Sequence, residues 1–71
     1  MLNFITATDF QSGKDIMINL DHIIRIAVHA SDRTEFTDIN GSTFLIEEPI
    51  ENISTAIRLI QATEMYQKGH S

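Results

Sequence analysis

The first 47 residues alternate apolar and polar positions in short runs, which is typical of β-strands. These runs are separated by brief polar stretches that contain turn-forming residues, so we expect neighbouring strands to pair antiparallel as a meander. The predicted strands are residues 2–7, 16–18, 23–30, 33–39 and 43–47.

The run 23–30 is the most apolar of the five. Side chains alternate between the two faces of a strand, so Ile24, Ile26 and Val28 should share one face. We expect that face to be buried and the opposite one, with Arg25, Ala27 and His29, to be half-exposed, as in an antiparallel sheet with one wet side.

Asn40 and Gly41 stand between the last two predicted strands and are the strongest hairpin signal in the chain. A type I′ turn needs positive φ at both central residues, and asparagine and glycine tolerate that conformation best. The sequence therefore predicts a two-residue type I′ hairpin at this point.

From about residue 49 to residue 68 the pattern changes to that of an amphipathic helix. Pro49 suits a first helical turn, where its missing N–H is not needed. Acidic residues near that end, Glu47, Glu48 and Glu51, favour the positive end of the helix dipole. The apolar stripe consists of Ile50, Ile53, Ile57 and Ile60, spaced by three and four residues.

These patterns predict one α+β domain over residues 1–71. It is a small antiparallel β-meander of about five short strands within residues 2–47, followed by one C-terminal α-helix packed on one face. A chain of 71 residues buries a small core, and without cysteine it has no disulfide to stabilise it. Association with another chain is one way in which such a domain gains stability.

The second side of the predicted helix offers a place for that association. Leu59, Ala62 and Tyr66 fall away from the isoleucine stripe and form the candidate interface. They are either scattered surface residues, which are normal, or the contact surface of a homo-oligomer, which we expect to be a dimer. Pairing of exposed sheet edges is the competing geometry for that dimer.

Ten acidic and five basic residues give the chain a formal charge of −5. Because nucleic acids and anionic membranes attract basic surfaces, we expect neither direct nucleic-acid binding nor membrane adhesion. The leading prediction is a protein-interaction or self-assembly module with an unknown protein partner. An alternative is an acidic decoy that blocks a nucleic-acid-binding site on another protein, using Asp32, Glu35, Asp38, Glu47, Glu48 and Glu51.

No catalytic, cofactor-binding or metal-binding residues are predicted. The internal histidines, His22 and His29, lie near acidic residues but lack a compact ligand spacing. The serines are outside any nucleophile-elbow motif, and no glycine-rich loop suits a phosphate. The adjacent Glu47 and Glu48 are explained by the helix dipole. The sequence therefore predicts a protein that is not an enzyme.

We expect a cytoplasmic location. The N-terminus lacks the basic and apolar regions of a signal peptide, and cysteine, which would suggest an oxidising compartment, is absent. No apolar run reaches the roughly 20 residues that a membrane span requires.

From Gly13 onward the chain resembles the small FlbD family found in flagellar operons. The matching segments are 13–14, 18–23, Ile26, 32–34, 39–42 and 46–48, followed by the isoleucine-striped helix. The resemblance implies no catalytic residues and no cofactor.

Overall fold

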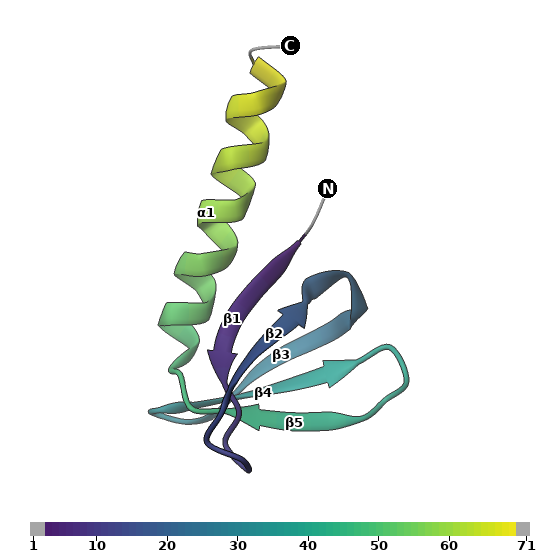
Figure 1. The fold of residues 1–71 in the computed structure, drawn as a ribbon, viewed down its shortest axis with the longest axis vertical. Coiled ribbons are helices and arrows are strands. Elements are labelled where there is room, and N and C mark those ends of the chain that lie inside the picture. Colours follow the sequence, from purple (N-terminus) through teal and green to yellow (C-terminus); the bar gives the residue numbers. More distant parts are fainter. Residues whose placement is uncertain (1–2, 70–71) are drawn as a thin grey trace.

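The computed structural model describes the backbone of residues 3–69 and the side chains of residues 3–63. Five strands and a short 3-10 helix precede a single long α-helix (Figure 1). The elements are β1 (Phe4–Thr8), β2 (Asp15–Asn19), η1 (Leu20–His22), β3 (Ile23–Ala30), β4 (Arg33–Asp38), β5 (Thr43–Ile46) and α1 (Ile50–Gly69). The predicted α+β class, with one helix after five antiparallel strands, is confirmed.

The strands form two sheets, one of β1 and β2 and one in the order β3-β4-β5, and all neighbours are antiparallel. The chain passes from the first sheet to the second through η1, where the Asn19 side chain accepts a hydrogen bond from Asp21 N at 3.0 Å. This local bond stabilises a tight change of direction after β2. The sheets also meet just beyond β1, where Asp9 pairs with Ile46.

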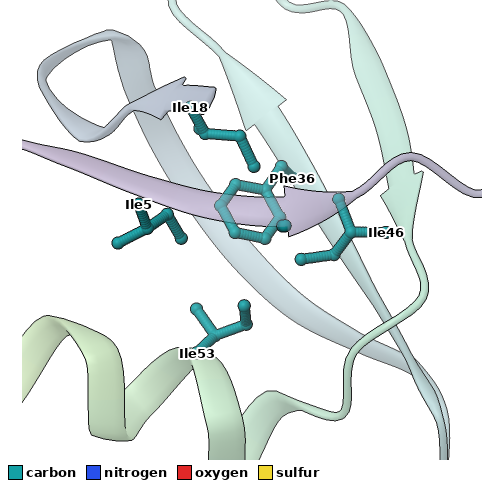
Figure 2. Packing of buried hydrophobic residues seen from close by; sticks show 6 residues of the cluster. Ile5, Ile18, Phe36, Ile46 and Ile53 are labelled. Carbon is teal, nitrogen blue, oxygen red and sulfur yellow. The ribbon is translucent and has the colours of Figure 1, made fainter. Parts of the chain in front are cut away.

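The core lies between the two sheets and the first turns of α1 (Figure 2). Among the described side chains, six apolar ones are buried: Ile5, Ala7, Ile18, Phe36, Ile46 and Ile53. The Phe36 and Phe44 rings stack with their centroids 5.5 Å apart, which adds a specific contact between β4 and β5. Every strand except β3 contributes a buried residue to this cluster, and β3 contributes Ile23 and Ile26 to its rim.

The helix begins one residue later than predicted. Pro49 precedes it, and the Pro49 carbonyl accepts hydrogen bonds from Asn52 N at 3.0 Å and Ile53 N at 3.4 Å. Pro49 thus occupies the capping position rather than the first turn. The isoleucine stripe faces the sheets as predicted, with Ile53 buried and its neighbours in the stripe half-buried. The later turns of α1 extend past the ends of the strands (Figure 1).

The Glu48 carboxylate has a different role from the predicted one. Its Oε1 accepts a hydrogen bond from Thr8 N at 2.9 Å, and so it fixes the segment before the helix to β1. Glu51 lies in the first helical turn, where an acidic residue suits the dipole. The dipole interpretation therefore applies to Glu51, whereas Glu48 satisfies a backbone donor of a strand.

The predicted type I′ turn at Asn40 and Gly41 is wrong. Gly41 has φ +83°, but no other residue type in the described chain has a positive φ, and a type I′ turn would require one at Asn40. Instead Gly41 N donates to Asp38 O and Asp38 N donates to Ser42 O, both at 2.9 Å. This is the hydrogen-bond pattern of a three-residue hairpin with glycine at the left-handed position. The Asp38 carboxylate favours the wider loop because it accepts from Asn40 N and Ser42 N.

Candidate interaction surface

Strand β3 is an edge strand. It pairs with β4 on one side, and among residues 3–69 no strand pairs with its other side. Register shifts interrupt the pairing near both ends, between Ile23 and Arg25 and between Val28 and Ala30. An edge strand presents backbone N–H and C=O groups to solvent or to another chain.

Two β-branched residues of this edge are exposed. Ile24 is 66% exposed and Val28 is 63% exposed, whereas Ile26 is half-buried opposite the core residue Phe36. The prediction that these three residues bury together on one face is therefore wrong for Ile24 and Val28. Ile24 lies at a register shift, and Val28 lies where the edge is not covered by a further strand.

Strict alternation along residues 23–30 predicted one buried face for Ile24, Ile26 and Val28, and so it did not indicate that two of these side chains are exposed. In the structure β3 has eight residues, while the strand that follows it has six. A longer strand paired with a shorter one across a tight turn needs bulges or an overhang. At such bulges the strict alternation of side chains between the two faces of the strand is interrupted.

A groove runs between β3 and α1 beside the exposed edge. It has a volume of about 460 Å³, and the apolar part of its lining comes from Leu20, Ile23, Ile24, Ile26, Ile57 and Ile60. A second hollow of about 310 Å³ continues along the helix and shares Ile26, Ile57 and Gln61 with the first. The isoleucine stripe of the helix therefore has two uses, since part of it closes the core and part of it lines an open groove.

The helix residues predicted as an interface are exposed where the structure describes them. Leu59 is 64% exposed, and Ala62 is exposed as well. Tyr66 lies within α1, but its side chain is outside the described residues. Exposed apolar side chains therefore occur around Leu59 and along β3, and also at Met17 in β2 and at Ile39 after β4.

Strand β3 contains one arginine, Arg25, and no acidic residue. Arg25 is an exposed side chain whose Nη1 lies 4.0 Å from Glu35 Oε1 on the neighbouring strand. An exposed ion pair at this distance adds little to stability. The Glu35 side chain is partly exposed beside Arg25.

The acidic residues of the decoy hypothesis are partly engaged within the chain. Asp38 accepts the two hydrogen bonds of the β4–β5 turn, and Glu48 accepts the bond from β1. Asp32 lies 3.9 Å from Arg33, measured between Oδ1 and Nε. Asp32 and Asp38 lie at opposite ends of β4.

The two internal histidines are far apart along β3. His22 is in η1, just before the strand, and His29 is near its other end. Within the described part of the chain, no three histidine, cysteine, aspartate or glutamate side chains are grouped as metal ligands would be. None of the described helices is both long and apolar enough to cross a membrane.

Comparisons with known proteins give no further assignment for this surface. No protein-family model matches the chain, and no curated protein or solved structure matches it.

Proposed function

We propose that this protein is a non-enzymatic interaction module that self-associates as a homodimer through the outer edge of β3 and the groove beside it. The observation that carries the proposal is the exposure of Ile24 and Val28 on an edge strand. Backbone groups on such an edge provide hydrogen bonds to an added strand, and exposed apolar side chains provide burial.

The small core supports association. Only six apolar side chains are buried among those that the structure describes. Covering Ile24, Val28 and the groove would remove further apolar surface from water, at roughly 25 cal/mol for each Å². A dimer would therefore add a second apolar cluster to a domain whose own core is limited.

The edge of β3 has two advantages over the helix surface around Leu59. It combines apolar side chains with unsatisfied backbone donors and acceptors, whereas the backbone groups of a helix interior bond within the helix. It also adjoins a concave surface, and interface residues contribute most where they fill pockets. The helix residues Leu59, Ala62 and Tyr66 remain the alternative site of the same dimer.

The non-enzymatic part of the proposal is supported by the structural roles of several polar side chains, which accept hydrogen bonds from backbone N–H groups. Glu48 holds Thr8 N, and Asn19 and Asp38 hold local turns. The resemblance to the FlbD family, which implies no catalytic residue, agrees with this view. We include the expected cytoplasmic location in the proposal, on the absence of cysteine.

Sedimentation velocity at several protein concentrations tests the proposal. We expect the parent protein to be a dimer that dissociates on dilution. Val28→Asp should raise the dissociation constant by about 100-fold or more, because a two-fold interface contains the substitution twice and buries the charge. Leu59→Asp is the matched control, since Leu59 is equally exposed and should leave the dimer intact.

The outcomes separate the possible answers. A parent protein that is monomeric at every concentration would overturn the proposal. A dimer that is broken by Leu59→Asp and not by Val28→Asp would move the interface to the helix surface. Circular dichroism should show that both variants remain folded, because both positions are exposed in the protomer.

A further inference from the structure

We infer that β3 pairs with β3 of a second copy in an antiparallel register centred on Ile26. This inference rests on the proposed dimer and specifies its geometry. The two copies would form one continuous sheet of six strands, three from each copy. In this register residue numbers of facing positions add to 52, so that Ile24 lies beside the partner's Val28 and Arg25 beside the partner's Ala27.

The apolar residues fit this register. Ile24 and Val28 are the exposed apolar residues of β3 and stand two positions on either side of Ile26. A two-fold axis through Ile26 therefore places Ile24 of each copy beside Val28 of the other copy. Facing β-branched residues are favourable cross-strand pairs, and Ile24, which lines the groove beside β3, would bring the partner's Val28 to the rim of that groove.

Charge complementarity on the opposite face selects the same register. Within one copy, Ala27 faces Glu35 of β4. Adding the partner's Arg25 on the other side of Ala27 creates a row of Glu35, Ala27 and arginine. The outer two positions are about 10 Å apart, which is two strand spacings. Alanine is small, so the long arginine side chain can extend over it towards Glu35.

The neighbouring registers lack this complementarity. A shift that centres the pairing on Arg25 would place the two arginines side by side, and facing like charges are destabilising. A shift that centres it on Ala27 would set Arg25 against His29 and separate Ile24 from Val28. The regular pairing of β3 with β4 runs from Arg25 to Val28, with Ile24 at the register shift on one side and His29 at the shift on the other.

Cysteine crosslinking tests the register directly, because the chain has no cysteine of its own. Arg25→Cys and Ala27→Cys are prepared separately, mixed and oxidised at a concentration at which the protein is dimeric. We expect the mixed pair to form a disulfide at least about tenfold faster than either variant alone, because facing residues come within disulfide distance. Thr37→Cys mixed with Ala27→Cys is the control, since Thr37 lies one strand farther from the interface.

A second measurement uses the unmodified protein. Hydrogen exchange of those backbone amides within residues 24–28 that point away from β4 should slow by about tenfold or more when the concentration rises from the monomeric to the dimeric range, because new interstrand hydrogen bonds form. The exchange of β1 amides should slow only as much as dimerisation raises the free energy of global unfolding.

The possible results distinguish this inference from the proposal on which it rests. Fast crosslinking of the mixed pair together with slowed exchange supports the register. A dimer in which Ala27→Cys alone crosslinks fastest, or in which exchange along β3 does not slow, overturns the register while self-association stands. A monomer in sedimentation overturns both.

Discussion

The hydroxyl of Thr34 donates a hydrogen bond to the carbonyl oxygen of Glu48 at 2.8 Å. Thr34 is fully buried in β4, and Glu48 belongs to the segment that leads from β5 into α1. The same residue Glu48 accepts from Thr8 N through its side chain. One short segment therefore connects β1, β4 and the start of the helix.

Thr34→Val should lower the free energy of unfolding by about 1–3 kcal/mol. The substitution keeps the shape of the side chain but leaves a partly buried carbonyl without its donor. Urea denaturation measures the change. Thr43→Val is the control, because Thr43 is an exposed strand residue and its replacement should stay within about 0.5 kcal/mol.

Glu48→Ala should destabilise the protein by about 1.5–3 kcal/mol, since it removes a charged acceptor from Thr8 N. Glu48→Gln retains an oxygen acceptor and should cost less. Thermal unfolding of the two variants compares them. Equal losses in both would contradict the role assigned to this hydrogen bond.

Gly41→Val should lower stability by about 1–3 kcal/mol, because a β-branched residue is strained at φ +83°. An added Cβ would meet no atom within 4 Å, so the cost is conformational rather than steric crowding with the rest of the fold. Gly41→Asn is the matched variant, since asparagine tolerates the left-handed region. Matching denaturation midpoints for the valine variant and the parent would be inconsistent with this turn.

Ile53→Ala should cost about 2–5 kcal/mol, as expected for a fully buried isoleucine. Ile57→Ala should cost less, because Ile57 is only half-buried and lines the groove. Leu59→Ala should change stability by no more than about 0.5 kcal/mol. Chemical denaturation of monomeric samples measures the three values, and a different order would contradict the assigned orientation of the helix.

The sequence determined the elements of this protein and their order. Period-two alternation predicted the strands, and the spacing of isoleucines predicted the helix and the face that it buries, on which the structure finds Ile53 buried. These predictions succeeded because side-chain periodicity depends on local backbone geometry alone. The positive φ of Gly41 was also predicted, because it depends on local backbone geometry, whereas the predicted type of turn was wrong.

The tertiary structure decided which positions are covered. Whether Ile24 and Val28 are buried depends on the place of β3 at the edge of a sheet, and that place follows from long-range pairing. Likewise Thr34 and Glu48 are 14 residues apart in sequence, so nothing local indicated their hydrogen bond. Burial and long-range hydrogen bonds are properties of the packed layers, because each depends on atoms that the folded chain brings together from distant positions.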